Sequence, residues 1–137
     1  MRATVETSFF VLVFFPLIYL LELTLPTFFV PFIEESLARL VPLLIVLYFH
    51  RNVHPFDIGL VAGATFGILE ICVKTINLGH FSILMLAPMF LVHVPNAVAQ
   101  SVVIDFSYDR RKYALIPVAF IICALYHWLY NAYLYVV

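Results

Sequence analysis

The chain has 137 residues, of which 65% are hydrophobic and 11% charged, and its mean hydropathy is +1.09. Soluble domains usually have about 25% charged residues, so this composition excludes an ordinary water-soluble protein and indicates an integral membrane protein. The net charge of -1 and the lack of a basic run argue against nucleic acid as a partner.

Five segments are apolar over a length near the roughly 17–25 residues that a transmembrane helix requires. In chain order they are residues 8–25, 33–49, 58–74, 82–104 and 114–136. We therefore predict an all-α, polytopic transmembrane helical bundle of about five spans. We expect it to form a single transmembrane domain over the whole chain, with the lipid bilayer as its solvent.

The Lys and Arg residues predict the orientation, because positive charge favours the cytoplasmic side of a membrane. With the N-terminus inside, five of the seven lie on that side: Arg2, Arg51, Arg110, Arg111 and Lys112. Lys74 then lies outside, and Arg39 falls within a predicted span. We expect an inside N-terminus and, with an odd number of spans, an outside C-terminus.

The second predicted span begins with an unusual group of charges in "FIEESLARL". Glu35 and Arg39 are four residues apart on a helix, so they can form an ion pair that lowers the cost of insertion. Glu34 faces about 100° away and has no local partner. Glutamates in the first turn of a helix also complement its dipole, which is a purely structural alternative for both.

Three glycines, Gly59, Gly63 and Gly67, are spaced four residues apart in the third predicted span. Glycines at this spacing line one face of a helix and allow another backbone to approach closely. Glu70 follows Gly67 by three residues and lies on the same stripe. The simplest interpretation is helix packing, and a further one is that the packed face delivers Glu70 into the interior of the bundle.

Polar residues also recur in the last two predicted spans. His93, Asn96 and Gln100 lie on one face of the fourth, within "HVPNAVAQ", and suggest a lined cavity rather than a single packing residue. In the fifth, "HWLYNAY" places His127 and Asn131 one turn apart, so that Asn131 could orient His127. Together with the glutamates, these residues predict a pocket that opens outward.

Ionisable residues inside a membrane cost at least about 2.5–3.5 kcal/mol each to insert, so they are functional candidates by default. Four other ionisable residues are not assigned to the site. We expect Glu22 at the outer interface and His50, His54 and His80 in loops.

The motifs carrying these residues resemble those of a known group of membrane proteases. "EESLAR" is similar to the EExxxR motif of the CPBP family of CAAX-processing and bacteriocin-processing intramembrane proteases. "FGILE" resembles the second motif of the related PrsW proteases, although these usually carry EExxK where this chain has Arg39. "HVPNA" and "HWLYNA" resemble the two later histidine motifs of the wider group, and the resemblance covers residues 32–133.

The resemblance implies an intramembrane peptidase acting on a membrane-protein or lipidated-peptide substrate, and we place it in a prokaryotic plasma membrane. The implied catalytic residues are Glu34, Glu35, Glu70, His93 and His127. The implied supporting residues are Arg39, Asn96 and Asn131.

Two mechanisms use these residues, because peptide hydrolysis needs an activated water and a stabilised oxyanion. In the first, Glu34 or Glu35 is the general base, the histidines bind the water or the oxyanion, and no cofactor is needed. In the second, His93, His127 and a glutamate, with Glu70 as the candidate, bind one divalent metal such as Zn²⁺. In both, we expect Arg39 to anchor Glu35 and leave the other glutamate free for chemistry.

Two other functions are compatible with the sequence. The γ-secretase complex contains a scaffold subunit from the same wider group, and in such a protein the histidines would fix helix packing. Glu and His relays also serve proton-coupled transporters. The chain shows no internal repeat of the kind transporters use, so that function would require a homo-oligomer.

Overall fold

A computed structural model describes residues 1–133 as a bundle of helices, and this range contains no β-strand. The first helix is α1 (Arg2–Glu22), and the next helical stretch comprises α2 (Val30–Ile33), the π-helical segment η1 (Glu34–Leu40) and α3 (Val41–Phe49). The remaining segments are α4 (Pro55–Leu78), the 3₁₀ turn η2 (Ile83–Met85), α5 (Leu86–Pro88), the π-helical η3 (Met89–His93), α6 (Val94–Arg110) and α7 (Leu115–Tyr133).

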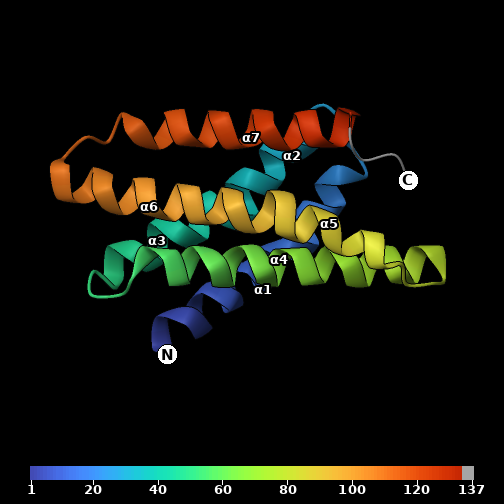
Figure 1. The fold of residues 1–137 in the computed structure, drawn as a ribbon, viewed down its shortest axis with the longest axis horizontal. Coiled ribbons are helices and arrows are strands. Elements are labelled where there is room, and N and C mark those ends of the chain that lie inside the picture. Colours follow the sequence, from blue (N-terminus) through green and yellow to red (C-terminus); the bar gives the residue numbers. More distant parts are fainter. Residues whose placement is uncertain (134–137) are drawn as a thin grey trace.

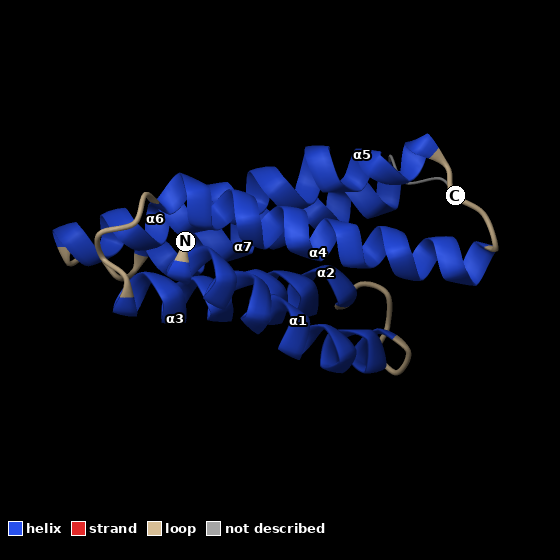
Figure 2. Ribbon diagram, turned by 90° about the horizontal axis from the view of Figure 1, so that it is seen from below, coloured by secondary structure: helices blue, strands red, loops and turns tan. Residues whose placement is uncertain are grey.

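The helices form two layers. Helices α4, α6 and α7 run side by side, and α1 crosses behind them at an angle (Figure 1). Figure 2 shows α1 and α3 together on one side of the layer that contains α4 and α6. The all-α helical bundle predicted from the sequence is therefore confirmed.

Four helical stretches in residues 1–133 are long and apolar enough to cross a membrane: Arg2–Glu22, Pro55–Leu78, Ile83–Arg110 and Leu115–Tyr133. They correspond to four of the five predicted spans and make the chain an integral, multi-pass membrane protein. The predicted span 33–49 is helical over 30–49. It differs from the other four because its three charged residues, Glu34, Glu35 and Arg39, are buried. The last residues of the predicted fifth span, 134–136, lie outside the described residues.

The chain passes back and forth between the two ends of the bundle. Its N-terminus and the turns at 50–54 and 111–114 lie at one end, and the turns at 23–29 and 79–82 lie at the other (Figure 1). The five cationic residues assigned to the cytoplasmic side belong to the first end. The positive charges that are spread along the sequence are therefore gathered at one end of the folded bundle.

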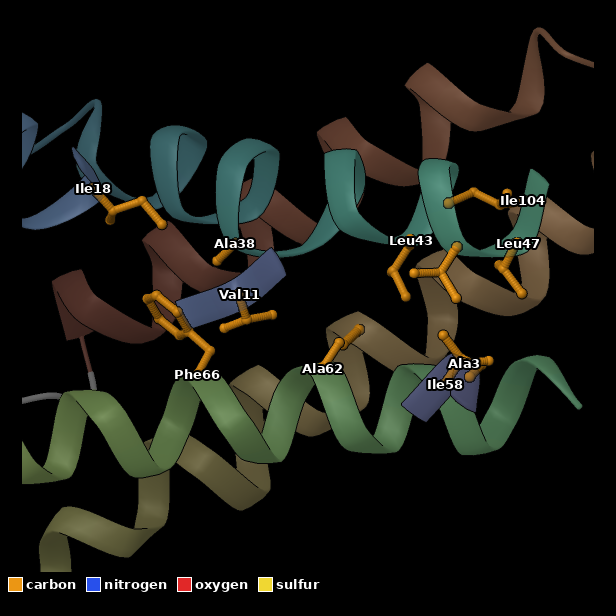
Figure 3. Close-up of a cluster of buried hydrophobic side chains, with 12 residues drawn as sticks. Ala3, Val11, Ile18, Ala38, Leu43, Leu47, Ile58, Ala62, Phe66 and Ile104 are labelled. Atoms are coloured by element: carbon orange, nitrogen blue, oxygen red, sulfur yellow. The ribbon is translucent and has the colours of Figure 1, made fainter. Parts of the chain in front are cut away.

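The outer faces of the helices are strongly apolar. Large side chains such as Leu20, Phe90 and Ile122 are exposed, an arrangement that suits contact with lipid. The buried apolar core lies between the layers, where Val11 and Ile18 of α1 approach Phe66 and Ala62 of α4 (Figure 3). The polar site described below lies beside this core.

The glycine stripe of α4 packs against the stretch 89–98, as the spacing of the glycines predicts. A Cβ atom at Gly63 would lie only 2.6 Å from the Cα of Val94 and 2.5 Å from the carbonyl oxygen of His93. At Gly59 it would lie 2.6 Å from the Cα of Val98. Only glycine permits this approach, which brings the backbone of His93 against α4.

We expect Gly63→Ala to destabilise the protein by about 3 kcal/mol, the upper end for overpacking, because the added methyl group meets backbone atoms that cannot turn away. Gly67→Ala is the matched comparison, since its methyl group meets mainly the side chain of Met89, which can change rotamer. In thermal unfolding in detergent, Gly63→Ala should have a lower melting temperature than Gly67→Ala. Equal melting temperatures would contradict the close approach at Gly63.

Candidate active site

Two π-helical segments carry the predicted site residues. η1 contains Glu34, Glu35 and Arg39, and η3 ends at His93. A proline follows each segment closely, at Pro42 and at Pro95. Proline has no N–H to offer the carbonyl four residues before it, and it clashes with that carbonyl. The helix accommodates this by widening locally, and such π-bulges are frequent at functional sites.

The carbonyl oxygen that Pro95 leaves without its helical donor belongs to Leu91. It accepts a hydrogen bond of 2.8 Å from the hydroxyl of Tyr126 on α7. Tyr126 therefore ties α7 to the widened turn that precedes His93. We infer that this bond fixes the position of His93 relative to α7.

Tyr126→Phe removes this bond and little else, because the exposed ring can stay in place. We expect a loss of about 1 kcal/mol in the free energy of unfolding, as for an ordinary hydrogen bond. We also expect the substitution to speed up amide hydrogen exchange in residues 89–94 and to leave exchange in α4 unchanged. Hydrogen-exchange mass spectrometry checks this, and unchanged exchange in η3 would show that Tyr126 does not hold the bulge.

Glu35 is the central residue of the site and is completely buried. Its carboxylate accepts hydrogen bonds from Arg39, from the Asn96 amide at 2.8 Å and from the Gln100 amide at 2.6 Å. Nδ1 of His127 lies 3.1 Å from the same carboxylate. Four donors thus surround the carboxylate of Glu35. These bonds occupy its oxygens and join helices, so the carboxylate is not free to accept from a ligand.

Arg39 extends the network from Glu35 to His93. Its guanidinium donates to Glu35 and to Nδ1 of His93, and its charge lies 5.1 Å from the centre of the Phe66 ring. Because arginine has only donors, Nδ1 of His93 must be the acceptor. The ring proton of His93 is therefore on Nε2, which bonds to the carboxylate of Glu70.

Glu70 also forms an ion pair with Lys74, one turn further along α4. The sequence prediction that the glycine stripe delivers Glu70 to the bundle interior agrees with this position. Both ring nitrogens of the buried His93 are occupied, by Arg39 and by Glu70. His93 consequently bridges α4 and η1 and has no nitrogen left over for a ligand.

His127 lies between the two adjacent glutamates. Its Nδ1 faces Glu35, and its Nε2 lies 3.2 Å from Oε2 of Glu34. That approach does not have the geometry of a hydrogen bond, so Oε2 of Glu34 has no hydrogen-bond partner among the described residues. The rings of His127 and His93 meet edge to face with their centres 5.2 Å apart.

A cavity of about 150 Å³ adjoins Glu34. It lies toward the end of the bundle that carries the 23–29 and 79–82 turns, as its lining residues show: Phe15, Tyr19, Glu22, Glu34, Phe66, Glu70, Val73, Lys74 and Asn77. Glu35 and the two histidines do not line it. The cavity therefore reaches the site on the side of Glu34.

Glu22 is a correction to the sequence prediction, which placed it at the outer interface and outside the site. It is half-buried at the end of α1 and lines the same cavity as Glu34. No local motif marks this residue, because its role depends on how α1 crosses α4. Its position 12 residues before Glu34, with Pro26 and Pro31 between them, was the available signal.

Asn131 is not brought to the site. It is exposed and lines a different pocket, with Thr27, Phe28 and Trp128. The predicted support of His127 by Asn131 is therefore replaced by support from Glu35. Asn96, the other predicted supporting amide, does join the site and also donates to the carbonyl of Cys123 at 3.0 Å.

The three other histidines lie outside the site, as predicted. His50 is at the opposite end of the bundle, where its ring lies 2.6 Å from the carboxylate of Glu6. His54 precedes the first turn of α4, and His80 is in the turn after it.

The predicted metal-binding set of Glu70, His93 and His127 does not fit a metal ion as these side chains are arranged. A zinc ligand must direct a free ring nitrogen or oxygen at the ion, but both nitrogens of His93 are hydrogen-bonded within the protein. No three His, Cys, Asp or Glu side chains within residues 1–133 are grouped to hold a metal.

Comparisons with models of protein families, with curated proteins and with solved structures gave no match to this chain.

Proposed function

We propose that the protein is an intramembrane peptidase in which Glu34 activates a water molecule for attack on a peptide bond. The observation that carries the proposal is the contrast between two adjacent glutamates. The carboxylate of Glu35 accepts hydrogen bonds at both of its oxygens. The carboxyl group of Glu34 has one oxygen without a hydrogen-bond partner among the described residues, and it borders a cavity. A buried carboxylate with free capacity to accept a proton is what a general base requires.

The other members of the site hold this base in position. Glu35 orients His127 through Nδ1, as a buried carboxylate orients the histidine of a catalytic triad. Since an ionised Glu35 only accepts, the Nδ1 position carries the ring proton, and Nε2 faces Glu34. His127 can therefore receive the proton that Glu34 takes from water and return it later in the reaction.

The place of the site in the fold also supports a membrane-embedded substrate. The cavity lies among helices whose outer faces are apolar, so a peptide reaching it passes along lipid-facing surface. The order of the four motifs, which resembles that of the CPBP and PrsW proteases, is a second line of support. We propose a membrane-protein or lipidated-peptide substrate and a prokaryotic plasma membrane as the location.

The test compares the termini of membrane proteins in cells that produce the wild type or Glu34→Gln. Glutamine keeps the shape of the side chain but cannot act as a base, and both proteins must be shown to insert equally. We expect a set of new termini in the wild type alone. Identical termini in the two strains would reject the proposal.

A non-catalytic scaffold is the second candidate. The observation that favours it is that Glu35, Arg39 and His93 form hydrogen bonds mainly within the protein and across helices. A scaffold of this kind would lose its partner when Arg39 is replaced but would be indifferent to Glu34→Gln. Comparing an Arg39 substitution with Glu34→Gln therefore separates the two functions.

A further inference from the structure

Three consecutive cationic residues, Arg110, Arg111 and Lys112, lie where α6 ends and the turn to α7 begins. All three are exposed, and none of them forms an ion pair with another of residues 1–133. The N–H of Lys112 donates to the carbonyl of Ser107 at 3.0 Å, which fixes the turn against the end of α6. The three charges are therefore held together on the surface without a compensating carboxylate.

Arg111 has a backbone conformation that suits glycine better than arginine. Its φ is 54°, and no other residue except glycine has a positive φ within residues 1–133. Glycine occupies this left-handed position after a helix without steric cost, whereas a residue with a Cβ atom is strained there. The chain keeps a charged side chain where glycine would be more stable, which indicates that the positive charge has a use.

An apolar groove extends from this turn along the outer surface between α6 and α7, which run side by side (Figure 1). Its volume is about 300 Å³, and its lining is entirely apolar, with Val102 and Phe106 on α6 and Leu115, Val118 and Ile122 on α7. These residues recur every three or four positions, so they follow one face of each helix. From Leu115 to Ile122 the groove is about 10 Å long. A narrow apolar groove of this kind suits an acyl chain.

The cationic residues lie at the turn end of the groove. Arg110 follows Phe106 by four residues, so it continues the lining face of α6 toward the turn. Lys112 lies on the α7 side, where its carbonyl accepts a hydrogen bond of 3.0 Å from the N–H of Leu115. The two charges therefore flank the point at which the groove meets the turn.

The acidic residues of α6 lie on a different side of the helix. Asp105 and Asp109 follow Ser101 by four and eight residues, and Ser101 packs against Gly59 of α4. They are therefore on the side of α6 that is nearer to α4. No acidic side chain is among those that line the groove, so nothing there repels an anionic headgroup.

We propose that the groove and the cationic turn form a binding site for one anionic phospholipid. Its phosphate lies at the turn with Arg110, Arg111 and Lys112, and one of its acyl chains lies between α6 and α7. Cationic residues beside a membrane-spanning helix attract anionic headgroups, about fivefold in affinity for each residue. Tyr113 is exposed in the same turn, and tyrosine is enriched at the depth of the headgroups. The proposal does not depend on the peptidase function.

Positive charge at one end of a bundle also sets its orientation, and Arg2 and Arg51 supply such charge away from the groove. Arg2 pairs with Glu6. Arg51 lies over the ring of Tyr108, which is two residues after Phe106 and so about 200° from it around α6. These two arginines are the matched control, since they carry two charges at the same end of the bundle.

The headgroup contact is tested by native mass spectrometry of the purified protein with added phosphatidylglycerol or phosphatidylcholine of the same acyl chains. We expect the wild type to prefer phosphatidylglycerol. The double variant Arg110→Gln, Lys112→Gln should weaken phosphatidylglycerol binding about 25-fold and leave phosphatidylcholine binding unchanged. The control Arg2→Gln, Arg51→Gln should bind like the wild type. A wild type without this preference, or equal losses in the two double variants, would overturn the site.

The acyl-chain contact is tested by filling the groove without a change of charge. Ala119→Phe and Val118→Phe both place a ring among the lining residues, and Val118 is exposed enough to accept a larger side chain. We expect both variants to weaken phosphatidylglycerol binding while keeping the preference over phosphatidylcholine. Unchanged affinity in both would overturn the placement of the acyl chain in the groove. None of the substituted residues belongs to the proposed peptidase site, so these results are independent of cleavage.

Discussion

Arg39→Met should destabilise the protein by about 3–5 kcal/mol, the range for removing one partner from a buried ion pair. Arg39 is completely buried and donates to both Glu35 and His93. Methionine fills much of the same volume but leaves Glu35 with an uncompensated charge and His93 without its donor. We therefore expect a large drop in the melting temperature in detergent, together with loss of any activity.

Arg51→Met is the matched control for this prediction. Arg51 is exposed at the opposite end of the bundle, where its guanidinium lies 4.1 Å from the centre of the Tyr108 ring. An exposed contact of this kind contributes about 0.5–1 kcal/mol, so the melting temperature should change little. Similar losses in the two variants would mean that Arg39 is not the centre of the buried network.

Glu34→Gln and Glu35→Gln should have opposite profiles, although they alter adjacent residues in the same way. We expect Glu34→Gln to lower kcat by about 10²–10⁴-fold, the usual contribution of a general base. It should leave the stability nearly unchanged, because Oε2 of Glu34 has no hydrogen-bond partner among the described residues and Arg39 pairs with Glu35 instead. Glu35→Gln removes the charge that balances Arg39, so it should cost about 3 kcal/mol in stability as well as activity.

Thermal unfolding and single-turnover cleavage of the two variants give this comparison directly. Equal stability of the two variants would show that Glu35 is not the anchored glutamate. A Glu34→Gln variant with normal turnover would show that the free glutamate is not the base, and would favour the scaffold function.

The fold followed closely from the sequence because the bilayer imposes simple rules. Apolar runs of membrane-spanning length, broken by turns with proline, glycine or charge, located all the helices within about six residues of their observed starts. The largest difference is at α1, which begins at Arg2 rather than at residue 8 because Arg2 and Glu6 pair one turn apart and continue the helix. Helix contacts were predictable only at the glycine stripe.

The site was predictable where its partners lie on one helix. The ion pair of Glu35 and Arg39 follows from their spacing, and the stripe of His93, Asn96 and Gln100 follows from the helical repeat. Sequence spacing also suggested that one glutamate would be anchored and the other free. The structure identifies Glu35 as the anchored one.

The parts of the site that join different helices were not predictable from spacing. Asn131 shares a helix face with His127, but it lies near the end of α7, where it is exposed and lines a separate pocket with Thr27, Phe28 and Trp128. Glu22 reaches the cavity only because of the angle at which α1 crosses the second layer. The prolines at 42 and 95 are a local signal for the π-helical segments, and recognising them would have predicted where the helices widen.

The central claim is that this site hydrolyses peptide bonds with a water activated by Glu34. Its most direct test is to incubate membranes containing the wild type or Glu34→Gln in heavy-oxygen water and to analyse the new C-termini by mass spectrometry. We predict C-termini that contain one heavy oxygen in the wild-type membranes and none in the Glu34→Gln membranes. Labelled C-termini of equal abundance in both, or in neither, would contradict the claim.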